Sequence, residues 1–325
     1  MYAMNKTANR PGLRLITVFG LLIGLTACGG GGGSSSGGGG ASLPATPVTI
    51  TVQNKAAVAG AAVDAAIGGM SMSALGVQTS ASEPSGVAAA VKVGKIGQTA
   101  VQRVTQSTGR GTVTGTTYSY PCTISGTYSE DVGTTSATLT FSNCSDTAGD
   151  VMNGSLTITN MASTSTTLTF DMNFNLTFTC SCGSTGSVKG DMHVVANTST
   201  GAMTISGSSL TTTDSANGNM GLQNYSITMD ASGNITAMTF TFASTVIIGT
   251  ATFTMTTPFV FSGGNFPSSG AAIISGASST KLRVTVLGNE YAPVGSQVKL
   301  ELSTDNGATY GTPSYVTWAD ISSNI

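Results

Sequence analysis

The chain has 325 residues and only 8% of them are charged, against about 25% in typical globular proteins. Three of its 12 Lys and Arg residues lie in residues 1–27 and none of its 14 Asp and Glu residues does, so the rest of the chain is acidic. This balance argues against a nucleic-acid binder. The Thr, Ser, Gly and Asn residues that replace charge are typical of exported β-proteins.

Residues 1–27 have the three parts of a bacterial lipoprotein signal peptide in the required order. A basic start precedes the uncharged apolar residues 15–25, which are too few to span a bilayer as a mature helix, and small residues then end at Cys28. We expect cleavage before Cys28 and lipid on its sulfur, with acyl chains such as palmitate holding the protein on a membrane. Gly29, rather than Asp, follows and favours the outer membrane. The alternative is an ordinary secretory signal with a chance cysteine.

Residues 28–47 are predicted to be the lipidated cysteine and a tether. Residues 29–40 contain only Gly and Ser, which cannot bury apolar area and behave as a flexible coil. We expect this segment to link the membrane to the folded part of the chain.

Residues 48–110 are predicted to be a helical lead-in. Residues 48–52 form a candidate short strand, and the Ala-rich residues 55–67 are expected to be helical. Residues 87–104 are a second candidate helix. Its apolar residues at near-helical spacing are Val87, Val91, Val93, Ile96, Ala100 and Val104.

Residues 111–325 are predicted to be an antiparallel β-domain, because the apolar period changes to two. The clearest run is residues 168–180, where apolar and polar side chains alternate and therefore lie on opposite faces of a strand. Similar runs separated by turn signals such as Asn153-Gly154 predict roughly 10–14 strands. The candidate ligand-facing side chains on the apolar face of the clearest run are Leu168, Phe170, Met172, Phe174, Leu176 and Phe178.

The expected fold is mainly β: a large curved antiparallel meander, or half-barrel, with one or two amino-terminal helices packed on it. A sheet with one apolar face must cover that face. The covering could also come from closure into a barrel, or from lipid around a transmembrane barrel. A lone Trp residue and the tether argue against the lipid-facing alternative.

Four cysteines remain after Cys28, and an even number in an exported chain suggests disulfides. Residues 123–128 and 137–141 are expected to form a hairpin around a turn at residues 130–133, with Cys122 and Cys144 opposite each other at its open end. Cys180 and Cys182 lie too far apart on a strand for an easy bridge, although a small strained ring is possible where a strand ends. A metal site at this pair is disfavoured, because oxidised thiols cannot bind zinc.

The order of parts is similar to that of periplasmic lipoprotein carriers with a convex sheet and a helix. The Thr/Gly-rich strands and the Trp318-Ala319-Asp320 sequence resemble more closely a group of uncharacterised exported lipoproteins of proteobacteria. The first resemblance implies a carrier architecture only, and the second implies no activity. Separately, residues 303–310 resemble an Asp-box, a hairpin turn in which an Asp side chain binds the loop backbone.

No group of residues predicts catalysis. A Ser/His/Asp catalytic triad would need His193, the only histidine in the sequence, and no G-x-S-x-G motif is present. A paired-carboxylate hydrolase or a calcium site would need acids of which most are expected in or beside turns, where carboxylates usually accept backbone hydrogen bonds. The acids considered are Glu130, Asp131, Asp146, Asp150 and Asp171, with Asn143 as a further oxygen donor for calcium.

The sequence therefore predicts a membrane-anchored envelope lipoprotein that is not an enzyme and holds no metal or cofactor. A binding module is favoured, and a hydrophobic small molecule or an envelope protein is its candidate partner. The alternatives are a structural or adhesive surface protein and, less favoured, a transmembrane β-barrel. The periplasmic and surface faces of the outer membrane are both open.

Overall fold

The structure is a computed structural model that describes residues 43–73, 116–133, 135–145, 150–179, 185–214, 218–231, 234–262 and 266–322. The predictions for the signal peptide, Cys28 and the tether up to residue 42 lie outside these residues, as do those for the second helix at 87–104 and for Cys180 and Cys182. Within the described segments, no helix is both long and apolar enough to cross a membrane.

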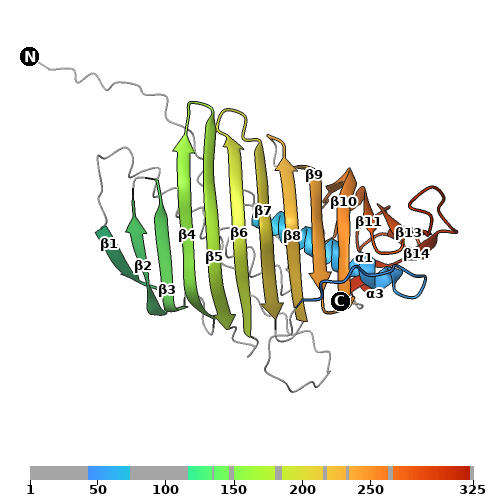
Figure 1. Ribbon diagram of the computed structural model, residues 1–325, viewed down its shortest axis with the longest axis horizontal. Coiled ribbons are helices and arrows are strands. Elements are labelled where there is room, and N and C mark those ends of the chain that lie inside the picture. The colour runs from blue at the N-terminus through green and yellow to red at the C-terminus, as the bar shows by residue number, and fades with distance from the viewer. Residues whose placement is uncertain are drawn as a thin grey trace, which may run out of the picture. The chain divides into compact units, whose positions relative to one another are not determined.

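The described chain forms one open antiparallel sheet whose 14 strands lie side by side in sequence order (Figure 1). This confirms the predicted meander. The strands are β1 (Thr116–Pro121), β2 (Ser125–Val132), β3 (Ala137–Ser145), β4 (Val151–Ser163), β5 (Thr167–Thr179), β6 (Thr185–Asn197), β7 (Met203–Asp214), β8 (Gly218–Met229), β9 (Ile235–Ser244), β10 (Gly249–Val260), β11 (Ser269–Ser275), β12 (Lys281–Val286), β13 (Val298–Ser303) and β14 (Ser314–Val316).

Alternation of apolar and polar side chains sets the pairing of the strands. A slip of one residue would turn every apolar side chain to the solvent, so a strand with one buried face has a strongly specified register. β5 accordingly pairs with β6 without interruption from Thr167 opposite Asn197 to Thr179 opposite Thr185. Leu156, Phe174, Leu210, Leu222 and Phe242 fall in one cross-strand row that runs from β4 to β9.

Helix α1 (Lys55–Ser73) packs on one face of the sheet, which we call the inner face. Its contacts are with β8, β9, β12, β13 and the short helix α3 (Trp318–Ser322), and Figure 1 shows it behind the sheet. Most of its alanines, including Ala62 and Ala66, are buried, so the backbone can approach the sheet closely. The helix predicted for residues 55–67 is confirmed and extends to Ser73.

Residues 48–52, which precede α1, do not form the predicted strand. This part of the chain instead bonds to the sheet at two points. Only Pro47 makes a bridge, parallel to Thr250. The Val48 amide donates to the Thr250 carbonyl at 2.8 Å, and the Ala277 amide donates to the Val48 carbonyl at 2.7 Å. The segment thus joins β10 to the turn between β11 and β12.

Two local predictions about turns were wrong. Asn153-Gly154 lies inside β4, where Gly154 has a φ of 114° and a Cβ atom would clash with the Asn175 carbonyl on β5. Glu130 and Asp131 lie inside β2 rather than in a turn, and the turn is closed instead by the Gly133 amide donating to the Ser136 carbonyl at 2.8 Å.

The carboxyl end of the predicted β-domain contains a short helix after its last strand. β14 ends at Val316, and Trp318 begins α3 because Thr317 and Asp320 form a reciprocal helix cap: the Thr317 amide donates to Asp320 Oδ2 at 2.9 Å, and the Asp320 amide donates to Thr317 Oγ1 at 2.9 Å. Trp318 stacks on Phe266 at 4.6 Å, and its ring nitrogen donates to the Gly288 carbonyl at 2.7 Å.

Candidate functional site

All six predicted ligand-facing side chains lie on the inner face of β5. Phe170, Met172, Phe174 and Leu176 are buried, and Leu168 and Phe178 are partly buried and pack against the same core. These side chains lie on the same face of the sheet as α1. Phe170 lies opposite Val194 on β6, and the same cross-strand row continues through Ile205 and Ile227 to Met238 on β9. The predicted surface is therefore one part of a continuous apolar face.

The inner face is covered in two different ways along the sheet. α1 lies against β8, β9, β12 and β13. On β4, β5 and β6, side chains such as Leu156, Leu176 and Val188 are 0% exposed, although neither described helix has its main contacts with these strands. We call the inner face of β3 to β7 the open-side face; its side chains need a cover other than α1 and α3.

The open-side face is chemically uniform. The inner-facing residues of β5 and β6 are all uncharged, and they include Met172 and Met192. Flexible thioethers adapt to irregular apolar neighbours, so this face can pack against a protein segment or against an aliphatic chain. The inner-facing residues of β5 and β6 provide no charged group that would orient a polar substrate.

A buried carboxylate and an aromatic row lie at the β1 end of the open-side face. Glu130 on β2 is 3% exposed, between Tyr118 on β1 and Leu139 on β3. Tyr120 stacks on Tyr128 at 5.2 Å, and Tyr128 lies 6.1 Å from Phe141 on β3. A carboxylate beside aromatic rings favours a cationic neighbour.

The opposite, outer face carries His193 in a hydrogen-bonded group that the sequence did not predict. His193 Nδ1 and Asp171 Oδ1 are 2.6 Å apart, and Asn160 Nδ2 donates to Asp171 Oδ2 at 2.6 Å. Hydrogen bonds from Asn160 and then His193 lower the pKa of Asp171. His193 opposite Asp171 in register is the signal that could have found this pair. The His193 side chain is 50% exposed, so the group is a solvated hydrogen-bonded pair on an open face.

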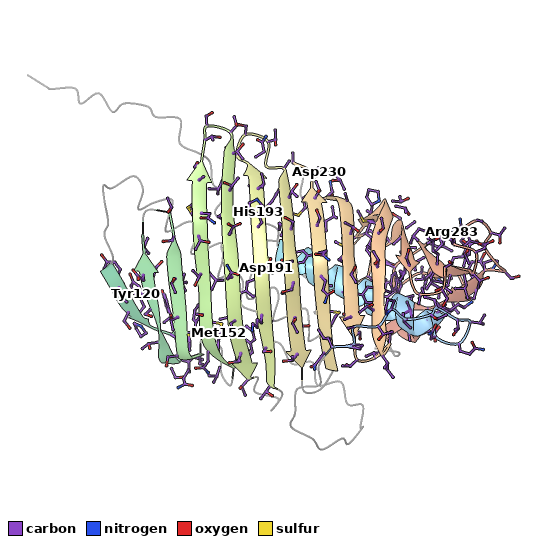
Figure 2. All side chains as sticks on the ribbon, viewed as in Figure 1. Tyr120, Met152, Asp191, His193, Asp230 and Arg283 are labelled. Atoms are coloured by element: carbon purple, nitrogen blue, oxygen red, sulfur yellow. A yellow bond between two sulfur atoms is a disulfide. The ribbon has the colours of Figure 1, made fainter. Side chains whose placement is uncertain are left out.

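A second outer-face group on β6 fixes a β-bulge. Asp191 accepts hydrogen bonds from the Ser208 amide at 2.7 Å and the Ser209 amide at 2.9 Å, and they lower its pKa against the effect of desolvation (Figure 2). On the inner side, the buried Tyr225 hydroxyl donates to the Asp191 carbonyl, and any Cβ at Gly207 would clash with it. This network holds β6, β7 and β8 in register and is structural.

Cys122 and Cys144 form a disulfide with a Cα–Cα distance of 5.5 Å, which confirms the predicted pair. It joins the turn before β2 to β3, and a bulge at Gly126 and Asn143 brings the cysteines together. Asp146, one of the residues considered for a calcium site, lies outside the described residues. The backbone amide of Asn143 donates to Asn153 Oδ1 at 2.7 Å. The described part of the chain contains no cluster of three or more His, Cys, Asp or Glu residues able to hold a metal.

The Asp-box forms the turn between β13 and β14. Asp305 accepts hydrogen bonds from the Ser303 hydroxyl at 2.6 Å and the Thr309 amide at 2.9 Å, and these bonds lower its pKa. Arg283 on β12 lies 4.1 Å over the Tyr310 ring at the end of the box. The box therefore has a structural role.

Comparisons of the chain with protein-family models, with curated proteins and with solved structures find no match.

Proposed function

We propose that this chain is a lipid-anchored protein of the outer membrane whose sheet binds an apolar ligand without catalysing a reaction. The observation that carries the proposal is the open-side face: it is apolar, buried and continuous over β3 to β7, and α1 and α3 have their main contacts elsewhere. A ligand that lies there would contact only apolar side chains of this face.

The chemistry of the face favours an aliphatic ligand, such as an acyl chain. Because these side chains are already buried, the affinity would come from the ligand's own apolar surface, at about 0.8 kcal/mol per buried CH2 group. The inner-facing side chains of β5 run from Leu168 to Phe178, a distance of about 33 Å at 3.3 Å per residue. An extended apolar chain can follow such a row along the strand.

The expected anchor supports the same proposal. A lipid on Cys28 and the Gly/Ser tether of residues 29–40 would hold the sheet beside a membrane, where acylated ligands are concentrated. Cys28→Ser is expected to release the protein from the membrane fraction. Retention of the Cys28→Ser variant on the membrane would contradict the anchor without bearing on the ligand.

Native mass spectrometry of the chain purified from its own membrane tests the ligand. We expect the wild type to carry an extra lipid mass and Phe174→Asp to lack it, because a carboxylate on the inner face opposes apolar contact. Asn175→Asp is the matched control, since its side chain is exposed on the outer face of the same strand and should leave the bound mass unchanged. A wild-type chain without any co-purifying mass would overturn the proposal.

A structural or adhesive role is the second candidate, and the outer face favours it. Hydroxyls join neighbouring strands there, with Ser187 and Thr213 at 2.7 Å and Thr241 and Thr252 at 3.2 Å. Such uncharged rows suit contact with sugars or other surfaces. Protease treatment of intact cells separates the roles, because a surface adhesin is cut and a protein on the periplasmic side is shielded.

A further inference from the structure

Three of the five described basic side chains lie together near the carboxyl end of the sheet. Lys281 and Arg283 belong to β12 and Lys299 belongs to β13, whereas the other two lie on α1 and β6. The cross-strand row of Arg283 continues through β11, β10, β9, β8 and β7 to His193, so the three cations are on the outer face; Figure 2 labels both ends of this row. In a chain that is otherwise acidic, this is a local surplus of positive charge.

Glu301 on β13 positions two of these cations. Arg283 Nε donates to Glu301 Oε2 at 2.8 Å, and Lys299 Nζ lies 3.1 Å from the same oxygen. The Glu301 side chain is only 10% exposed, and the hydrogen bond from Arg283 lowers its pKa, so the carboxylate stays ionised. A cation that is already held in place loses less side-chain freedom when it binds a ligand.

The cations keep hydrogen-bond donors for a ligand. Among the described residues, none accepts a hydrogen bond from the two Nη groups of Arg283, and none forms a hydrogen bond or an ion pair with Lys281. The acids nearby are engaged, because Glu301 binds two cations and Asp305 accepts its hydrogen bonds from within the Asp-box. A guanidinium with free Nη groups beside ammonium groups suits carboxylates, which arginine binds through two parallel hydrogen bonds.

Two tyrosines border the cations. Arg283 covers the Tyr310 ring, and a Cβ atom at Gly307 would lie 3.2 Å from Lys281 Cδ and 3.4 Å from the Tyr310 hydroxyl, so these side chains converge over the Asp-box. Tyr315 on β14 lies opposite Lys299 in register and is 53% exposed. An exposed tyrosine offers an apolar ring face and a polar edge, which suits the C–H and O–H groups of a sugar ring.

We propose that this part of the outer face binds an acidic polysaccharide, with its carboxylates on the cations and a sugar ring on Tyr315. A polymer that carries a carboxylate on each sugar can contact several cations at once, and charge-assisted hydrogen bonds are stronger than neutral ones. The cations select an anion and the exposed ring selects a sugar, whereas the acidity of the remaining chain argues against a nucleic acid. The residues of this cationic patch are Lys281, Arg283, Lys299, Glu301, Tyr310 and Tyr315.

The cationic patch and the open-side face lie on opposite faces of the sheet, so the two proposals are independent. Phe174→Asp, which should remove the apolar ligand, is expected to leave polysaccharide binding unchanged.

Isothermal titration of the mature chain with polygalacturonate tests the cationic patch. We expect Arg283→Gln to weaken binding at least about tenfold, because it removes charge-assisted hydrogen bonds. Lys281→Gln should weaken binding several-fold, and it breaks no hydrogen bond among the described residues, so its effect does not depend on a change in the fold. Lys189→Gln is the matched control, since Lys189 is an exposed cation on the outer face of β6, and it should leave binding unchanged.

Poly-L-glutamate and dextran separate the charge from the sugar. Poly-L-glutamate carries carboxylates without sugar rings, so Tyr315→Ala should weaken polygalacturonate binding several-fold and leave poly-L-glutamate binding unchanged. Dextran, which is a neutral polysaccharide, should not bind.

Two results would overturn the proposal. One is no binding of polygalacturonate to the wild type at low salt, and the other is equal losses of affinity from Lys281→Gln and Lys189→Gln. Equal affinity for poly-L-glutamate and polygalacturonate, with no effect of Tyr315→Ala on either, would replace the polysaccharide with an acidic protein.

Discussion

The two ends of the sheet share one sequence pattern but are covered differently. In β8 to β13, the described helices α1 and α3 and residues 43–50 complete the core, with Trp318 and Ile50 fully buried. In β3 to β7 the same alternation produces an equally apolar face, yet neither described helix has its main contacts there. The comparison shows that alternation specifies which face of a strand is buried, whereas the covering element is specified elsewhere in the chain.

The largest expected effect on stability comes from replacing a buried Phe by Ala at each end of the sheet. Phe253 stacks on Phe240 at 4.7 Å under the α1 end, and Phe253→Ala should lower the free energy of unfolding by about 3–5 kcal/mol. Urea unfolding of Phe253→Ala and Phe174→Ala compares the two ends directly. Equal losses would mean that the open-side face is packed as firmly as the α1 end, whereas a much smaller loss for Phe174→Ala would indicate a looser cover. Thr254→Ala, which is exposed, is the control and should change the stability little.

Removal of the disulfide tests the β1 end alone. Replacement of both Cys122 and Cys144 by Ser opens a loop with a sequence separation of 22 residues, which should cost about 3 kcal/mol. Hydrogen exchange should become faster in β1 to β3 and stay unchanged in β12 and β13. Uniform acceleration over all strands would show that the two ends unfold as a single unit.

Asp64 on α1 gives a pH-dependent prediction for the other end. Burial raises its pKa from 3.8 to about 6, so the folded state binds an extra proton between these values. Stability should therefore fall as pH rises from about 4 to about 6 and stay level above that range. Asp64→Asn should be more stable than the wild type by about 2–3 kcal/mol at pH 7, and the difference should vanish below pH 4. A gain that is the same at pH 4 and pH 7 would contradict this account.

The smallest effect on stability is expected from a substitution on the outer face, where the two ends of the sheet do not differ in how they are covered. His193→Ala should cost less than about 1 kcal/mol, because the hydrogen bond between His193 and Asp171 is largely solvated. The pKa of Asp171 is lower in the folded state than in the unfolded state, so the group adds stability at pH values above its unfolded pKa. This contribution is lost as pH falls through its folded pKa. Urea unfolding at pH 7 and pH 3 should therefore show a smaller effect of the substitution at pH 3.

The sequence predicted what depends on period and local chemistry. The alternation in residues 168–180 placed β5 within one residue at each end, and the hairpin around residue 133 paired Cys122 with Cys144. Gly154 was misread because a glycine that admits a close neighbouring strand looks the same in sequence as a turn glycine. The Asp171–His193 pair joins residues 22 positions apart on β5 and β6, so only the register between these strands, and not the alternation within either one, identifies it.

The connection order has a consequence for how the protein folds. Each strand pairs with the next in sequence, so the sheet can grow hairpin by hairpin with low contact order, in the direction in which the chain is synthesised. The amino-terminal contacts are the exceptions, because the bonds of Val48 to Thr250 and Ala277 and the docking of α1 on β12, β13 and α3 join residues more than 200 positions apart. α1 is synthesised before the strands but can complete its contacts only after β12, β13 and α3 have been synthesised. We therefore expect the docking of these carboxyl-terminal elements on α1 to be the last step of folding.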